Sequence, residues 1–144
     1  MLFSSSRDDL RRGWLDAWQR ARAGTILTPL ETQISSIVGE HPEYHTWLER
    51  GDAALHADFR PEDGNVNPFL HLSMHLALRE QVNTNRPAGI GAVHATLGKR
   101  LGAHEAEHRM MEALGRALWD AQRAGRAPDE RAYLEELERL AGRR

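Results

Sequence analysis

The chain has 144 residues, including eight histidines and no cysteine, and its formal net charge is −2 when histidine is neutral. The lack of cysteine excludes disulfides, iron–sulfur clusters and thiol nucleophiles, so a metal site would have to use nitrogen and oxygen ligands. The charge argues against electrostatic binding of nucleic acid, and no apolar run approaches the roughly 20 residues of a membrane span. Eight histidines exceed the roughly three expected at this length, so the excess needs a physical reason.

The N-terminal residues contain no apolar stretch of the kind found in secretory signals, so we expect a cytoplasmic protein without a membrane partner. Lys99 is the only lysine among 19 basic residues. This bias toward arginine is typical of GC-rich genomes and indicates a bacterial source.

Two well-marked helices and some shorter pieces are predicted in the first part of the chain. The serines at 4–6 can cap a first helix, which carries apolar residues at helical spacing and ends at Gly24. The segment Thr28–Glu31 reads Thr-Pro-Leu-Glu, a capping box that starts a second helix, and Pro42 ends that helix. A short helical piece follows, and residues 52–59 add one or two turns.

The remainder of the chain predicts longer helices separated by two loops, at 60–67 and 83–89. Leucine alternates with other residues over 69–78, as it would in a strand, but β-branched residues are missing there and Asn67-Pro68 is a helix start. We therefore expect helices over 68–81, 90–101, 103–123 and 129–140. With about six helices and no convincing strand, residues 1–144 are predicted to form an all-α, single-domain helical bundle without a sheet.

Six of the eight histidines form pairs separated by three residues, which are His41/His45, His71/His75 and His104/His108. Random placement would give only about 0.4 such pairs. On a helix, residues four apart share one face, so two imidazoles can converge on one metal ion at metal–nitrogen distances of about 2.0–2.1 Å.

The three pairs do not carry equal weight. Pro42 separates the members of the first pair, whereas the other two pairs lie on helices that we expect to be buried. Two such helices packed side by side would bring four imidazoles together, as in the metal sites of helix bundles. The sequence therefore predicts a divalent Zn, Fe or Mn ion with these ligands: His71, His75, His104, His108, the carboxylate Glu112 and, as a possible addition, His45.

Two further patterns involve the same histidines. The spacings His108-x3-Glu112 and His45-x3-Glu49 give a partial likeness to haemerythrin-like cation-binding bundles. Residues 104–108 also fit HExxH, in which Glu105 would be the general base of a zinc protease. We do not expect a protease, because no strand is predicted to hold a substrate and the longer metzincin motif is not continued downstream. Whether the chain is a metal-dependent hydrolase, a redox protein or no enzyme stays open, and no catalytic residue is assigned.

The alternative is a structural or interaction module in which the histidines are hydrogen-bonding residues of the core. In this interpretation the aromatic and Arg-rich helices form an interface, including that of a homo-oligomer, with an unidentified protein partner. The four tryptophans would be core or interface anchors. The arginines of the first helix are predicted to form a solvated surface, namely Arg7, Arg11, Arg12, Arg20 and Arg22.

Long segments of the chain resemble the domain-of-unknown-function 1841 family, which consists of uncharacterised bacterial proteins. They are HPEYH at 41–45, NPFLHLSMHLALREQ at 67–81 and AEHRMMEALGRALWDAQR at 106–123, and the opening and closing segments are similar too. The resemblance implies a small proteobacterial cytoplasmic protein without an established activity. It also implies that the family shares the positions of His41, His45, His71, His75, His104, His108 and Glu112, whereas the position of Glu105 varies.

Overall fold

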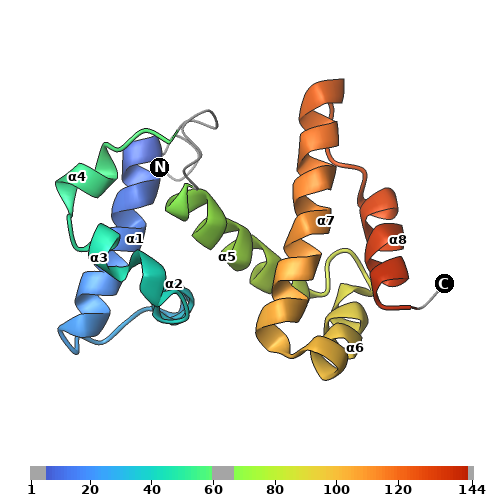
Figure 1. Cartoon of the computed structure of the whole chain (residues 1–144), viewed down its shortest axis with the longest axis horizontal. Helices are drawn as coiled ribbons and strands as arrows, with labels where there is room; N and C mark the ends of the chain where they lie inside the picture. The colour runs from blue at the N-terminus through green and yellow to red at the C-terminus, as the bar shows by residue number, and fades with distance from the viewer. Residues whose placement is uncertain (1–5, 60–66, 143–144) are drawn as a thin grey trace. The chain divides into compact units, whose positions relative to one another are not determined.

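The computed structural model describes residues 6–59 and 67–142, and every regular element in these ranges is helical. This described part contains eight α-helices, which Figure 1 labels, and the 3-10 helix η2; they are α1 (Arg7–Arg22), α2 (Pro29–Gly39), η2 (Pro42–Tyr44), α3 (His45–Leu48), α4 (Asp52–Leu55), α5 (Pro68–Thr84), α6 (Ile90–Leu101), α7 (Ala103–Ala124) and α8 (Glu130–Leu140). The all-α prediction is confirmed. The helix number exceeds the predicted one because residues 42–55 divide into three short pieces. Of the predicted loop at 60–67, only Asn67 lies within the described residues.

Side chains that the sequence marks as caps start the main helices. Ser6 and Asp9 form a capping box at α1, and Thr28 and Glu31 form another at α2. The Asn67 side chain accepts hydrogen bonds from the backbone of the first turn of α5, and Asp129 accepts from Ala132 N at the start of α8. The predicted helix starts are therefore confirmed at these four positions.

The chain divides into two compact units, Met1–Leu76 and Ala77–Arg144, and the boundary falls inside α5. The first unit contains α1 to α4 and the first half of α5. The second unit contains the rest of α5 with α6, α7 and α8. The single domain expected from the sequence stays a prediction.

The first unit has a core of aromatic and aliphatic side chains. In this unit α1 packs against α2 and α4 (Figure 1), and η2 contacts α2 and α3. The α5 helix joins the core through Phe69 and Leu72, and the Phe69 ring meets Trp47 edge-on at a centroid distance of 4.7 Å. The fully buried members of the core include Ile37, Val38, Ala54, Leu55 and Leu72.

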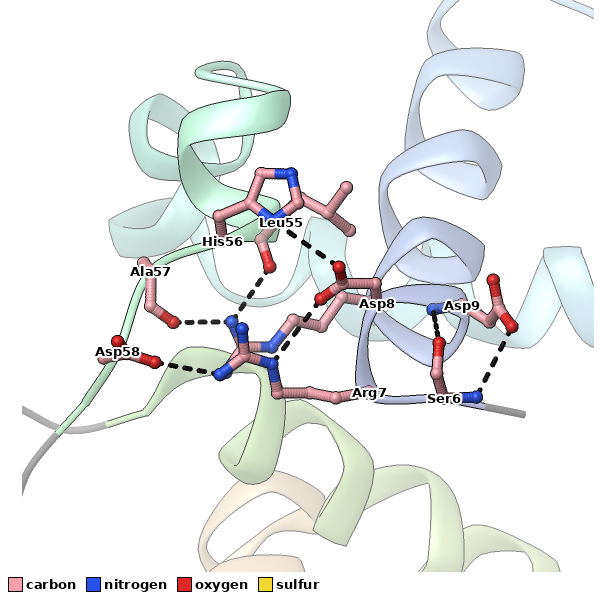
Figure 2. A network of polar contacts seen from close by, with 9 residues as sticks. Ser6, Arg7, Asp8, Asp9, Leu55, His56, Ala57 and Asp58 are labelled. Carbon is pink, nitrogen blue, oxygen red and sulfur yellow. Dashed lines mark hydrogen bonds and ion pairs between the residues drawn. The ribbon is translucent and has the colours of Figure 1, made fainter. Parts of the chain in front are cut away.

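A polar network joins α1 to the chain that follows α4. Arg7 Nη1 donates to Asp58 Oδ1 at 2.9 Å, and Asp8 Oδ2 lies 3.4 Å from His56 Nδ1 (Figure 2). Arg11 is only 6% exposed, so its predicted place on a solvated surface is wrong. Its guanidinium donates to the carbonyl oxygens of Leu55 and Ala57 and lies 4.8 Å from the centroid of the Phe69 ring. These carbonyls and the aromatic face replace the water that the buried cation loses.

In the second unit α6 and α8 pack against α7 (Figure 1). The buried apolar side chains of this unit include Leu78, Ile90, Val93, Leu97, Met110, Leu114 and Leu137. Glu107 is also buried, and the Arg79 Nε donates to both of its carboxylate oxygens at 3.1 Å. Two-oxygen contact with a guanidinium is the arrangement that best compensates a buried carboxylate.

Two of the predicted helix faces differ from the observed ones. We expected the helix of the His71/His75 pair to be buried, but Leu70 on α5 is 61% exposed. We expected the helix of the His104/His108 pair to be buried as well, yet His104 and Leu118 on α7 are exposed. The buried face of α7 instead runs through Glu107 and Met110, because the Arg79 ion pair lets a charged residue occupy an interior position.

Candidate metal centre

Three imidazoles of the first unit lie against one another. His41 Nε2 lies 3.1 Å from His75 Nε2, and His75 Nε2 lies 3.1 Å from His71 Nε2. Two nitrogens that bind one ion at about 2.05 Å lie about 2.9 Å apart in octahedral geometry and about 3.3 Å apart in tetrahedral geometry. The observed separations fall between these values. Each of these two contacts therefore has the spacing of two ligands to a common metal ion.

The end of α2 positions His41. The helix stops at Gly39, and Pro42 begins η2, so His41 follows the helix end with its backbone N–H donating to Val38 O. Its Nδ1 lies 2.7 Å from Ile37 O. A carbonyl oxygen only accepts, so Nδ1 carries a proton and, in the neutral ring, Nε2 is unprotonated and faces His75. A carbonyl that orients the ring through its other nitrogen is the usual second partner of a metal-bound histidine.

The other two imidazoles lie on α5 and share a face of that helix. His71 and His75 are four residues apart, and their ring centroids are 4.8 Å apart. Asn67 fixes the start of this helix one turn before His71, because its side chain accepts from the backbone N–H of Phe69 at 3.0 Å. His75 is fully buried, and His71 is partly exposed.

Tyr44 flanks the cluster from η2. Its ring is nearly parallel to that of His41, with centroids 5.8 Å apart, and meets His71 edge-on at 6.0 Å. Burial raises the pKa of the Tyr44 phenol, with a smaller contribution from the charge of Glu43, so the phenol is neutral at pH 7. The cluster therefore has an uncharged aromatic wall beside two of its members.

His45 was expected as a possible additional ligand, but its side chain contacts a backbone carbonyl and a tryptophan ring of the first unit. Its Nε2 donates to Val38 O at 2.7 Å, and its ring lies against Trp18 with centroids 4.6 Å apart. The His45 side chain thus caps one of the last carbonyls of α2. Pro42 separates His41 and His45 into different helical pieces, as the sequence predicts.

The remaining predicted ligands belong to the second unit, on α7. The rings of His104 and His108 meet edge-on at a centroid distance of 4.3 Å, so this pair also shares one face of its helix. His104 and Glu112 are exposed, and His108 is partly buried. The structure defines each unit by itself, so the expected convergence of this pair with the α5 pair stays a prediction.

The HExxH pattern lies in the same stretch of α7. Glu105, which would be the general base of a zinc protease, is exposed and forms an ion pair with Arg109 at 2.9 Å. Within the described residues there is no strand to hold a peptide substrate. The arrangement gives no support to protease chemistry.

Sequence reasoning missed His41 as a member of the cluster. We weighed His41 only as a partner of His45, and that pairing loses its meaning across Pro42. The sequence feature that could have indicated this role is a histidine between the end of a helix and a proline. Such a residue points away from the helix axis, and its side chain can turn back to the last carbonyls. The contact with His75 spans 34 residues, so no local pattern shows it.

Comparison with known protein families identifies the family of this chain. A family described as a domain of unknown function (DUF1841) matches residues 6–139. The chain belongs to this family. The resemblance deduced from the histidine-containing segments is therefore confirmed, whereas the partial likeness to haemerythrin-like bundles is not. No curated protein and no solved structure matches the chain.

The DUF1841 match covers both units and all the histidines of the chain. Its description assigns no activity, so function has to be argued from the site. Among the described residues, no helix is both long enough and apolar enough to cross a membrane.

Proposed function

We propose that this DUF1841 protein binds a divalent transition metal, Zn, Fe or Mn, with His41, His71 and His75 as core ligands. The supporting observation is that one ring nitrogen of each of these histidines lies within 4.8 Å of the others, while the Nδ1 of His41 donates to the Ile37 carbonyl. Three neutral imidazoles are suitable ligands for each of these ions and do not select one. The proposed function is therefore metal binding without an assigned reaction.

Proton counting favours a metal over hydrogen bonds alone. The unprotonated Nε2 of His41 can only accept a hydrogen bond, and His75 Nε2 lies 3.1 Å from it. If His75 Nε2 carries a proton, it can donate fully to His41 or to His71, but not to both. If it carries none, two lone pairs face each other at 3.1 Å. Across these two contacts neutral rings form at most one ordinary N–H···N bond, whereas a metal ion at this point can bind a nitrogen of each ring.

The same proposal covers the ligands predicted on α7. His104 and His108 would contribute further nitrogens and Glu112 a carboxylate, as the sequence predicts. His45 is the weakest member of the predicted set, because its Nε2 already donates to the Val38 carbonyl. Each of these residues can be tested separately from the three core ligands.

The deciding experiment measures metal in untagged protein by elemental analysis and zinc affinity by chelator competition. We expect close to one equivalent of metal, and at least a tenfold weaker dissociation constant in His41→Gln, His71→Gln and His75→Gln. His56→Gln and His94→Gln are matched controls, because they remove the same side chain outside the cluster and should bind zinc normally. Zinc at about 100 times its dissociation constant should stabilise the fold by about 2.7 kcal/mol.

Three outcomes bear on the ligand set. Less than about one-tenth equivalent of metal, together with an unchanged melting temperature after addition of zinc, iron or manganese, overturns the proposal. Weaker binding in His104→Gln, His108→Gln or Glu112→Gln supports ligands from α7, and unchanged binding removes them from the set. Affinity should also fall at lower pH, because protons compete with the metal for imidazole nitrogen.

A further inference from the structure

The second unit contains a cavity of about 280 Å³ at the meeting point of α5, α7 and α8. Its wall is mainly apolar and includes Pro87, Leu114, Ala117, Leu118 and Pro128. Pockets for drug-sized ligands measure about 300–1,000 Å³, so this cavity lies just below that range and fits a small metabolite.

Hydrogen bonds within the second unit fix the segments that surround this cavity. The hydroxyl of Tyr133, a residue only 4% exposed, donates to Gln81 Oε1 at 2.7 Å and so ties α8 to the end of α5. The Asn85 side chain accepts from Gly89 N at 3.2 Å and from Gly91 N at 3.0 Å, which fixes the segment that carries Pro87. A cavity framed in this way is largely formed before a ligand arrives, which lowers the entropy cost of binding.

Two opposite charges line the cavity beside this apolar wall. Arg86 and Glu130 both line it, and neither forms an ion pair in the described part of the chain. A guanidinium recognises a carboxylate, and a carboxylate recognises an ammonium group. The Gln81 side chain also lines the cavity and uses its carbonyl oxygen for Tyr133, so its amide nitrogen is the remaining donor of that group.

We propose that this cavity binds a small aliphatic α-amino acid, of which leucine is a representative. In this assignment Arg86 holds the α-carboxylate, Glu130 holds the α-ammonium, and the branched side chain packs against Leu114 and Leu118. Leucine is a small metabolite of the size that a cavity of about 280 Å³ suits. The site lies wholly within the second unit and is independent of the proposed metal centre.

The test titrates metal-free, full-length, ¹⁵N-labelled protein with leucine and follows amide chemical shifts. We expect saturable shifts at Gln81, Leu118 and Tyr133, with a dissociation constant of about 0.1–1 mM. Arg86→Gln and Glu130→Gln should each weaken binding at least fivefold. Arg12→Gln and Glu43→Gln remove the same charges from exposed positions of the first unit and should leave the affinity unchanged.

Two analogues separate the charged contacts. 4-Methylpentanoate lacks the ammonium group and isopentylamine lacks the carboxylate, so both should bind less tightly than leucine. Equal binding of 4-methylpentanoate, together with wild-type affinity in Glu130→Gln, overturns the amino-acid assignment. The absence of a saturable shift up to about 10 mM leucine, or shifts confined to other surfaces, overturns the site itself.

Discussion

At the scale of single residues, His41 shows how a helix end creates a ligand. Because α2 stops at Gly39, the His41 side chain reaches back to Ile37 O with one nitrogen and presents the other to His75. The orientation comes from the backbone of α2, and the neighbouring imidazoles come from α5. A substitution that keeps the ring but changes its neighbours can therefore test how precisely the cluster is held.

Tyr44 is the neighbour best suited to that test. Its ring contacts the rings of His41 and His71, and aromatic pairs contribute about 0.5–1.5 kcal/mol each beyond their buried area. We predict that Tyr44→Ala raises the zinc dissociation constant about five- to tenfold, because both imidazoles gain rotational freedom. Chelator competition measures this change.

Tyr44→Phe is the matched comparison, since it keeps the ring and removes only the hydroxyl. It should bind zinc within about twofold of the wild-type value, a difference of about 0.4 kcal/mol. If Tyr44→Phe is as defective as Tyr44→Ala, the hydroxyl rather than the ring supports the site, and the stacking argument is wrong.

At the scale of helices, what the sequence predicted well was local. The start of α2 depends on Thr28 and Glu31, which are three residues apart and bond to each other's backbone N–H. Such contacts need no knowledge of the rest of the fold. Arg11 is the opposite case, since the carbonyls that hold it are 44 and 46 residues away along the chain. A basic residue on an amphipathic helix gives no local sign of such distant partners.

The same limit applies to the candidate metal site. The pair His71/His75 was predicted because both residues lie on one helix, and the structure shows their nitrogens in contact. The third imidazole comes from a different helix, so its place depends on tertiary packing. Glu107 was missed as a buried residue for the same reason, because its partner Arg79 lies on α5.

The capping box of α2 gives a pH-dependent prediction. The backbone N–H of Thr28 lowers the pKa of Glu31, with smaller contributions from Arg20 and the Thr28 side chain. A lowered folded-state pKa means that the charged carboxylate contributes stability above the ordinary glutamate pKa of about 4.3. That contribution is lost as the pH falls through the lowered value. Glu31→Gln should therefore be less stable than wild type near neutral pH, and the difference should vanish in acid.

Urea denaturation at a series of pH values measures this difference in unfolding free energy. Thr28→Ala removes the other half of the box and should cost about 1 kcal/mol near neutral pH, and most of this cost should remain in acid because the hydroxyl accepts from the backbone N–H of Glu31. Glu43→Gln, an exposed change in the same unit, is the control for the loss of one negative charge. A pH-independent gap between Glu31→Gln and wild type would contradict the assignment of the pKa shift to the cap.

At the scale of the whole molecule, α5 is shared by the two units. Its first half places Phe69 and Leu72 in the core of the first unit, and Leu78 is buried in the second. Helix formation is cooperative, since each added residue extends an existing hydrogen-bonded ladder. If one unit unfolds, its half of α5 loses the side chains that it packs against. The other half of α5 belongs to the other unit, so that unit is destabilised as well.

We predict that the metal-free protein unfolds in a single calorimetric transition, with equal calorimetric and van't Hoff enthalpies. Ala77→Pro should divide this transition in two, because proline at the boundary removes the backbone N–H of residue 77 and clashes with the preceding turn, at a cost of about 3 kcal/mol or more. Ala77→Gly keeps the N–H and should cost only about 1 kcal/mol, with one transition retained. Two transitions in the wild-type protein would show that the shared helix does not couple the units, and that the single domain expected from the sequence is wrong.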